Sequence, residues 1–377
     1  MEIIFSFLLI LGVWYFFVFL LYRNAWQKIP NAIDKNDKDS VSVIVACRNE
    51  QNNISNLIEQ IRMQNFDKNR FELIVINDHS TDDTSSILEK EEAIWNKLKI
   101  VCLGEGEEGK KTAIEKGISF AKGDIIVCTD ADCSVTENWI TTITAYFSDE
   151  KIKMVSAPIL FKNKKGIFWE LQSLEFLSLI GSGAAAIGRG KSIFCNGANF
   201  AYRRSVFVEV NSFDKNIASG DDVFLMHKIK QKYANGIAFA KQKEAIVRTS
   251  SQPNILALIN QRKRWTAKSS YYKDWDTITI SILVFLMNIS IITLFILSLF
   301  NMEWLEFFLM LFLVKYISDY LFLIPILKFF KKRNLAFWIL PFETFDDIYI
   351  VVGTVSISKF VILFSSKLNV FIFSCNL

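Results

Sequence analysis

Long apolar runs near the two ends of the chain constrain its fold more than any other feature of the sequence. Residues 2–22 form one such run behind a single acidic residue, and residues 278–300 and 304–327 form two more. A helix of about 20 apolar residues is long enough to cross a bilayer. No basic stretch precedes the first run and no small-residue cleavage site follows it, so we expect it to be retained as an anchor. The sequence therefore predicts membrane-spanning helices on both sides of a globular middle.

Basic residues indicate which side of the membrane each run faces. Arg23 and Lys28 follow the first run, a basic stretch at residues 262–273 precedes the second, and a basic stretch at residues 328–333 follows the third. The turn between the second and third runs, which begins at Asn301, carries no positive charge. Since basic loops remain on the cytoplasmic side, the globular middle is predicted to lie in the cytoplasm.

The boundaries follow from these runs and from local composition. We expect the following five regions: an anchor at 1–22, a polar linker at 23–40, a globular domain at 41–252, an amphipathic interface segment at 253–277 and a membrane region of about three segments at 278–377. Residues 335–342 are predicted to be a short interfacial piece, with one more crossing at residues 348–364. Lys315 and Asp319 lie one helical turn apart inside the third run. Either the two side chains pair and face protein or water, or both lie near an interface and extend towards it.

Charge and cysteine usage narrow the class of function. The formal net charge of +4 is too small to predict a nucleic-acid partner. The six cysteines form no C-x-x-C pair, and the chain has only two histidines, which argues against a zinc site and against a disulfide framework. Scattered thiols suit a reducing compartment, in agreement with a cytoplasmic domain.

The globular middle alternates short apolar strands with amphipathic helices. Strands are predicted at residues 41–46, 71–76, 98–103 and 124–129, and helices at 52–63, after 80–83 and at 111–121. This alternation is typical of an α/β domain with a parallel, covered sheet, in which ligands bind at the carboxyl ends of the strands.

Acidic residues follow several of these strands. Glu50 comes after the first strand, Asp78 after the second, and Asp130 and Asp132 after the fourth. Carboxylates gathered at one edge repel one another unless a cation is bound. Hard oxygen ligands in this pattern suit Mg²⁺ or Mn²⁺, which also bridge substrate phosphates.

Five short motifs occur in order between residues 40 and 275. Together they resemble glycosyltransferase family 2, the inverting group that includes cellulose, chitin and hyaluronan synthases and ceramide glucosyltransferase. The matching motifs are Arg48-Asn49-Glu50, Asn77-Asp78, Asp130-Ala131-Asp132, Gly220-Asp221-Asp222 and Gln261-Arg262-Lys263-Arg264-Trp265. The resemblance implies a Rossmann-like nucleotide-sugar domain of the GT-A type between transmembrane helices. It also implies an integral membrane protein, at the inner membrane of a bacterium.

The resemblance implies roles for the carboxylates. Asp132 would bind the metal, and Asp130 would contact the ribose or the metal. Asp78 would accept a hydrogen bond from the base, uracil by this interpretation. Asp222 would take the proton of the acceptor hydroxyl, supported by Asp221. A helix amino terminus that attracts negative charge is the alternative for Asp221 and Asp222.

Further substrate contacts are implied at other matching positions. Glu50 belongs to the opening motif, and Lys110 or Lys111 would contact a phosphate or the base. Arg264 can fork onto the diphosphate and Trp265 can stack on a sugar, with Gln261 in the same motif. Asn196 and Gly197 stand near the acceptor, where polymer synthases carry a different motif. The alternative for residues 261–265 is a membrane-surface helix, and both roles can coexist.

Three functions remain open at this point. The leading one is metal-assisted transfer of a sugar from a nucleotide-sugar, UDP-linked by the resemblance, to a lipid or glycan acceptor at the membrane. The second is processive polysaccharide synthesis, against which the small number of spans argues. The third is a catalytically inactive membrane scaffold, against which the presence of the expected carboxylates argues.

Overall fold

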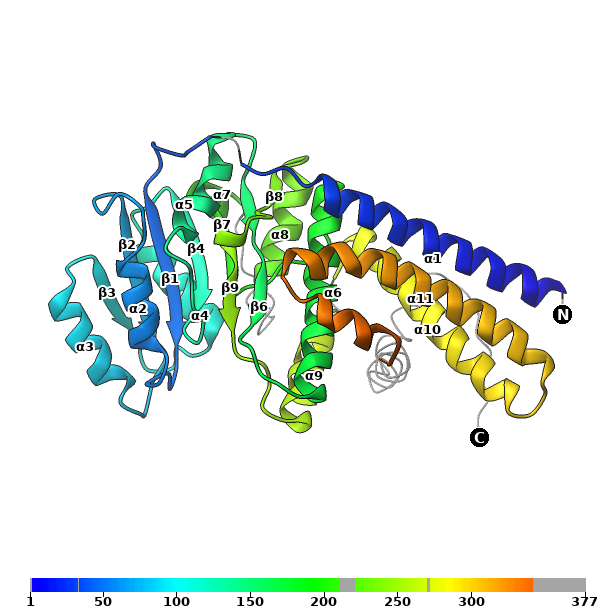
Figure 1. The fold of residues 1–377 in the computed structure, drawn as a ribbon. Helices are drawn as coiled ribbons and strands as arrows, with labels where there is room; N and C mark the ends of the chain where they lie inside the picture. Colours follow the sequence, from blue (N-terminus) through cyan, green and yellow to red (C-terminus); the bar gives the residue numbers. More distant parts are fainter. Residues whose placement is uncertain (1, 33, 211–220, 270–271, 342–377) are drawn as a thin grey trace. The chain divides into compact units, whose positions relative to one another are not determined.

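The computed structural model describes residues 2–32, 34–210, 221–269 and 272–341, which fall into two compact units (Figure 1). We call them the helical unit and the sheet unit. The helical unit comprises Met1–Leu21, Gln252–Ile324 and Asn334–Leu377, and the sheet unit comprises Tyr22–Ser251 and Pro325–Arg333.

A seven-stranded sheet in the order β3-β2-β1-β4-β7-β5-β8 is the core of the sheet unit, beside a two-stranded sheet of β6 and β9. The strands are β1 (Val41–Cys47), β2 (Phe71–Asn77), β3 (Leu98–Cys102), β4 (Ile125–Asp130), β5 (Met154–Ser156), β6 (Ile159–Phe161), β7 (Asn199–Arg203), β8 (Ile237–Phe239) and β9 (Val247–Thr249). The predicted strands, β1 to β4, are parallel neighbours, with Val41 opposite both Phe71 and Ile125. β7 is antiparallel to β4 and β5, so the sheet is mixed, whereas the sequence predicted a parallel one.

Helices cover this sheet. In the sheet unit they are α2 (Ile54–Arg62), α3 (Thr84–Ile94), α4 (Lys110–Phe120), α5 (Trp139–Thr144), α6 (Ile167–Gly188), α7 (Arg204–Glu209) and α8 (Asp221–Lys232), with short 3-10 turns η1 (Ala145–Ser148) and η2 (Lys243–Ala245). Gly117 lets α4 approach the sheet closely, because a Cβ there would come within 2.6 Å of the side chain of Ile76. Close packing of α4 fixes where its first turn meets the strand ends.

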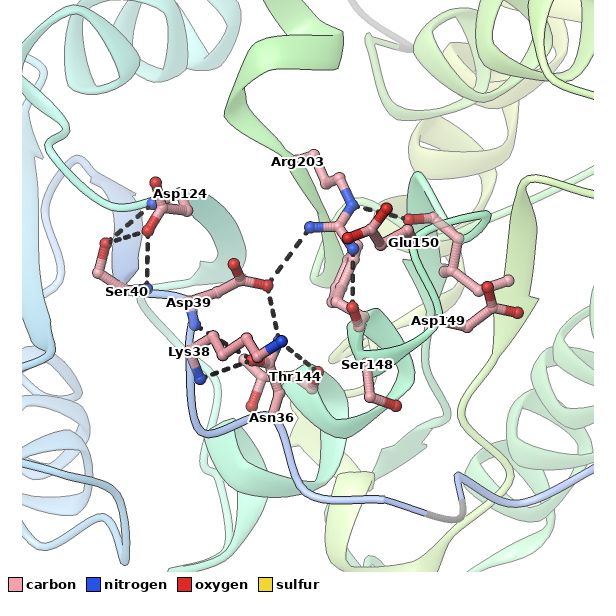
Figure 2. Close-up of polar contacts among 12 residues, drawn as sticks. Asn36, Lys38, Asp39, Ser40, Asp124, Thr144, Ser148, Asp149, Glu150 and Arg203 are labelled. Carbon is pink, nitrogen blue, oxygen red and sulfur yellow. Dashed lines mark hydrogen bonds and ion pairs between the residues drawn. The ribbon is translucent and has the colours of Figure 1, made fainter.

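The end of the predicted linker makes polar contacts with the rest of the sheet unit (Figure 2). The Arg203 guanidinium lies 3.3 Å from the Asp39 carboxylate, which also accepts a hydrogen bond of 2.8 Å from the Asn36 amide. The Ser40 hydroxyl donates to Asp124 over 2.6 Å, just before β4. Composition indicates a polar connection here, but the contacts of Asp39 with Arg203 and of Ser40 with Asp124 are long-range and leave no local pattern in the sequence.

The first helix, α1 (Glu2–Lys28), extends past the predicted end of the anchor at residue 22. Within the sheet unit, Trp26 is 2% exposed and its ring contacts Phe329 edge-on, with centroids 5.6 Å apart. The Lys241 ammonium donates to the Trp26 carbonyl at 2.6 Å, which satisfies a free carbonyl of the last turn. The last turn of α1 is therefore part of the folded sheet unit.

Four helices among the described residues are long and apolar enough to cross a membrane, namely α1, α6, α10 (Trp275–Ser298) and α11 (Glu303–Phe329). The apolar window of α6 is 61% buried inside the protein, against 28% to 33% for the other three. We therefore treat α6 as a core helix of the sheet unit. The helical unit also contains α9 (Ile255–Ser269) and η3 (Arg333–Trp338). The predicted crossing at residues 348–364 lies outside the described residues.

Inside the helical unit, α1 and α11 run in the same direction. Phe5 contacts Phe307, with ring centroids 5.9 Å apart, and Phe19 contacts Phe322 at 5.5 Å. Both residue numbers rise together, so the amino-terminal ends of the two helices lie on one side. This is the arrangement that the predicted topology requires, because it puts the basic residues after both helices on the other side.

A buried ion pair lies on α11 halfway along its length, and a hydrogen bond links it to α1. The Lys315 ammonium lies 3.1 Å from the Asp319 carboxylate, with 3% and 11% of the two side chains exposed. The Tyr15 hydroxyl of α1 donates to Asp319 over 2.8 Å. The predicted pairing of Lys315 with Asp319 is thus present, and its environment is protein.

Candidate active site

The carboxyl ends of β1 and β4 bring three carboxylates into electrostatic contact. β1 and β4 are neighbours with Ala46 opposite Asp130, and Glu50 follows β1 while Asp132 follows β4. Burial raises the pKa of Glu50, the charges of Asp132 and Asp130 raise it further, and a hydrogen bond from Asn53 opposes them. Negative charge is therefore concentrated at this edge, as the sequence predicted.

Lys110 supplies the positive charge closest to this group. It is the first residue of α4, and its ammonium donates to the Asp130 carboxylate. Desolvation opposes the charge on Lys110, but Asp130 and, more weakly, Asp222 hold the pKa of its ammonium above the ordinary value. The ion pair thus places Lys110 beside Asp130, and the donor-binding roles of both residues remain predictions.

Asp132 is positioned by residues that the sequence analysis did not single out. One carboxylate oxygen accepts a 2.8 Å hydrogen bond from the Thr249 hydroxyl, and the Asp132 carbonyl accepts one of 2.9 Å from the Lys162 ammonium. Thr249 ends β9 and Lys162 follows β6, so both lie at the carboxyl end of a strand, where ligands are expected to bind. They were missed because three-residue strands carry no recognisable period.

Asp78 has more partners than its position at a strand end suggested. It is 6% exposed, and its carboxylate accepts a 3.0 Å hydrogen bond from the N–H of Gly109, just before α4. Arg48 lies 3.8 Å away and the His79 ring nitrogen 3.1 Å away. Asp78 thus has a structural role at the start of α4, which the sequence did not indicate.

The loops that follow β1 and β2 are hydrogen-bonded to each other. The Asn49 N–H donates to the Ser80 hydroxyl over 3.0 Å, and the Asn49 side chain accepts from the Thr81 N–H over 2.8 Å. Asn49 and His79 have positive φ angles of 57° and 52°, which are uncommon for residues other than glycine. The two loops therefore support each other beside Glu50 and Asp78.

Asp222 lies in the first turn of α8, against the turn that precedes β7. A Cβ at Gly197 would lie 3.0 Å from its carboxylate, so a larger residue there would push the carboxylate away by a few tenths of an ångström. Burial first and the charge of Asp222 second raise the pKa of Cys195. The charge of Asp222 also raises the pKa of Lys110, so Asp222 lies at the same edge of the sheet as Asp130. The predicted base and the Asn196–Gly197 turn are therefore neighbours.

The remaining predicted residues are distributed as follows. Lys111 is half-buried on α4, and the Asn196 side chain accepts a 3.0 Å hydrogen bond from the Ala198 N–H. The side chain of Asp221 lies outside the described residues. Gln261, Arg264 and Trp265 lie on α9 of the helical unit, so they are described apart from the carboxylates.

The α9 helix has the character expected of a membrane-surface segment. Ile255 and Leu256 are 64% and 67% exposed, and Arg264 is also exposed. The Arg262 guanidinium stacks over the Trp265 ring at 4.2 Å from its centre. One face of Trp265 is thus occupied by a cation of its own helix.

The donor atoms at the sheet edge fit a divalent ion that is shared with a substrate. No group of three or more His, Cys, Asp and Glu side chains within the described ranges is placed to hold a metal on its own. Mg²⁺ and Mn²⁺ sites for phosphate substrates commonly use one or two carboxylates, with water and phosphate oxygens completing the shell. Asp130 and Asp132 satisfy that smaller requirement. Their negative charges also raise the pKa of Glu50, which indicates that a cation would be stabilised beside these carboxylates.

The chain is similar in sequence to known glycosyltransferases. The family model of Glycosyl transferase family 2 matches residues 42–210. Poly-beta-1,6-N-acetyl-D-glucosamine synthase of Staphylococcus aureus is 28% identical over 218 residues, which are 56% of this chain and 51% of the relative. Beta-monoglucosyldiacylglycerol synthase of a Nostoc species is 27% identical over 247 residues, 63% of this chain and 51% of the relative. The chain thus spans about half the length of the curated relatives it matches.

A solved structure shares the fold. The mannosyltransferase PcManGT of Pyrobaculum calidifontis, solved in complex with GDP-Man and Mn²⁺, superposes with a TM-score of 0.58 at 16% identity. The match covers 93% of this chain and 97% of that one. At this identity the match concerns the fold, and it agrees with the predicted GT-A domain flanked by apolar helices.

Proposed function

Residues 42–210 belong to glycosyltransferase family 2, and from this premise we propose that the chain is a membrane-bound inverting enzyme. It moves one sugar from a UDP-linked donor to a lipid or glycan acceptor. The observation that carries the proposal is the meeting of Asp130, Asp132 and Glu50 with Lys110 and Asp222 at one sheet edge. These groups are suited to hold a sugar diphosphate and to accept a proton beside it.

Donor binding is assigned to the ends of β2 and β4. Asp132 and Asp130 would hold Mg²⁺ or Mn²⁺, which neutralises the charge that develops on the leaving diphosphate. Lys110, already paired with Asp130, adds a fixed positive charge for the same oxygens. Asp78 accepts a hydrogen bond from the uracil. The motif resemblance also assigns Arg264 to the diphosphate, since a guanidinium can bind it through two hydrogen bonds.

Acceptor activation is assigned to Asp222. Its carboxylate takes the proton of the acceptor hydroxyl as the oxygen attacks the anomeric carbon. The bond between that carbon and the diphosphate breaks, and the nucleoside diphosphate leaves with the electron pair. Attack opposite the leaving group inverts the anomeric centre. The close approach of Gly197 to Asp222 supports this role, because it places the carboxylate beside the turn that the resemblance assigns near the acceptor.

Membrane attachment is part of the proposal. α1, α10 and α11 cross the membrane, and the sheet unit lies in the cytoplasm at the inner membrane of a bacterium. The apolar windows of these helices and the exposed Ile255 and Leu256 of α9 support it.

Processive polysaccharide synthesis is the second candidate. The resemblance to a poly-beta-1,6-N-acetyl-D-glucosamine synthase favours it, and the resemblance to a glucosyldiacylglycerol synthase favours single transfer. Product length distinguishes the two, since a synthase yields a series of oligomers and a single-transfer enzyme yields one product.

The test uses purified full-length protein in detergent with membrane lipid extract. UDP-glucose, UDP-N-acetylglucosamine and GDP-mannose are supplied with Mn²⁺ or Mg²⁺, and nucleoside diphosphate release and product masses are measured. We expect release from a UDP-sugar, lost in chelator and restored by metal. If none of these donors is turned over under any metal condition, the proposed function is wrong.

A further inference from the structure

Three stretches that are far apart in the sequence bring basic side chains together in the sheet unit. β6 and β9 pair with Leu160 opposite Arg248, and Lys162 follows β6 (Figure 1). The ammonium of Lys332, after the end of α11, donates to the Asn163 side chain over 2.6 Å. We call Lys162, Arg248 and Lys332 the basic triad.

Protein carboxylates neutralise the triad only in part. Within the described part of the chain, no salt bridge joins its members to Asp or Glu. Burial lowers the pKa of Lys332 and the nearby Arg248 lowers it further, with Glu170 opposing. Cations that are held close together repel one another, so an anion bound among them would be stabilised.

The triad adjoins both the candidate active site and the end of an apolar helix. Lys162 donates to the Asp132 carbonyl, and Thr249, next to Arg248, donates to the Asp132 carboxylate. Lys332 follows the end of α11, a helix apolar enough to span a membrane. An anion at the triad would therefore lie beside the metal-binding aspartate and close in sequence to a membrane span.

We propose that the basic triad binds the phosphate group of the acceptor, which is a phosphate-bearing membrane lipid. This rests on the proposed function, because it names the class of acceptor for the same site. The donor diphosphate is served by Lys110 and the metal aspartates, which leaves the triad for a second phosphate. Phosphate oxygens accept charge-assisted hydrogen bonds from ammonium and guanidinium groups, whereas an uncharged glycan or diacylglycerol has no anion to offer.

The test measures lipid binding separately from turnover. Full-length protein in uncharged detergent is titrated with dioctanoyl phosphatidic acid, with dioctanoylglycerol and with inorganic phosphate, and heats of binding are recorded. The test variant combines Arg248→Gln with Lys332→Gln. The matched control is Lys90→Gln, an exposed lysine on α3.

We expect phosphatidic acid to bind the wild type about tenfold more tightly than dioctanoylglycerol, and the double variant to lose about that factor. The control should bind like the wild type. Equal affinities of wild type and double variant for phosphatidic acid would overturn the proposal, and so would equal affinities of wild type for the charged and uncharged lipids. Inorganic phosphate that displaces the lipid at equal concentration would show a free-anion site instead.

Turnover keeps the two proposals apart. If the wild type binds the lipid phosphate but releases no nucleoside diphosphate from any donor, the proposed function fails and the binding site stands. If it turns over donor while the double variant keeps the KM for the lipid acceptor, the inference fails and the proposed function stands.

Discussion

The buried ion pair of the helical unit permits a quantitative test. Lys315 and Asp319 lie 3.1 Å apart with 3% and 11% of their side chains exposed. At an effective dielectric constant of about 20, unit charges 3.1 Å apart attract by about 5 kcal/mol. Removing one partner leaves an uncompensated buried charge, which typically costs about 3–5 kcal/mol. Lys315→Met and Asp319→Leu should each destabilise the helical unit by about that amount.

The double variant separates attraction from mere packing. With both charges gone, neither desolvation cost remains, so Lys315→Met combined with Asp319→Leu should be more stable than either single variant. Tyr15 then loses Asp319 as the acceptor of its 2.8 Å hydrogen bond, so part of the stability is lost in the double variant as well.

The assay is thermal unfolding of the detergent-purified protein, followed by the loss of the monodisperse peak in size-exclusion chromatography. At about 2–4 °C per kcal/mol, each single variant should lower the midpoint by about 10 °C. Lys328→Met, at the exposed end of α11, is the matched control and should leave it unchanged. A double variant whose loss equals the sum of the single losses would refute the reasoning, because uncoupled residues add.

The other predictions concern the active site and the topology. Asp132→Asn should abolish metal-dependent turnover and weaken nucleotide binding; full activity in chelator would contradict the metal role. Asp222→Asn should lower the transfer rate by about 10²–10⁴ with donor affinity and melting temperature unchanged, and a near-normal rate would move the base elsewhere. Gly197→Ala puts a Cβ 3.0 Å from the Asp222 carboxylate and should lower kcat about tenfold at constant donor affinity, measured as nucleoside diphosphate release. An impermeant thiol reagent applied to intact cells should label Asn301→Cys and not Asn334→Cys; the reverse pattern would overturn the topology.

Much of the sheet could be predicted because its first half is built from local patterns. β1, β2, β3 and β4 are buried apolar runs that alternate with amphipathic helices, and their observed bounds lie close to the predicted ones. The antiparallel entry of β7 between β4 and β5 could not be predicted, because it depends on pairing between residues far apart in the chain. Strands of three residues, such as β6 and β9, are too short to show a period.

The residues of the candidate site could likewise be predicted only in part. Glu50, Asp130 and Asp132 could be singled out because they follow parallel strands, whose carboxyl ends lie at one edge of the sheet. It could not foresee that Asp78 would be bound by the N–H of Gly109, since that contact depends on where α4 packs. Thr249 escaped for a related reason, because its strand was not recognisable. The roles assigned to individual carboxylates remain predictions.

The mutual support of the loops after β1 and β2 has a thermodynamic consequence for ligand recognition. Fixing the backbone of one residue costs about 1–2 kcal/mol of conformational entropy. Asn49 and His79 already adopt their unusual left-handed conformations, and Ser80 and Thr81 already hold the neighbouring loop through hydrogen bonds. The entropy of these loops is thus lost when the protein folds rather than when a nucleotide arrives. A ligand that contacts them keeps more of its interaction free energy as affinity, and this advantage applies to any base.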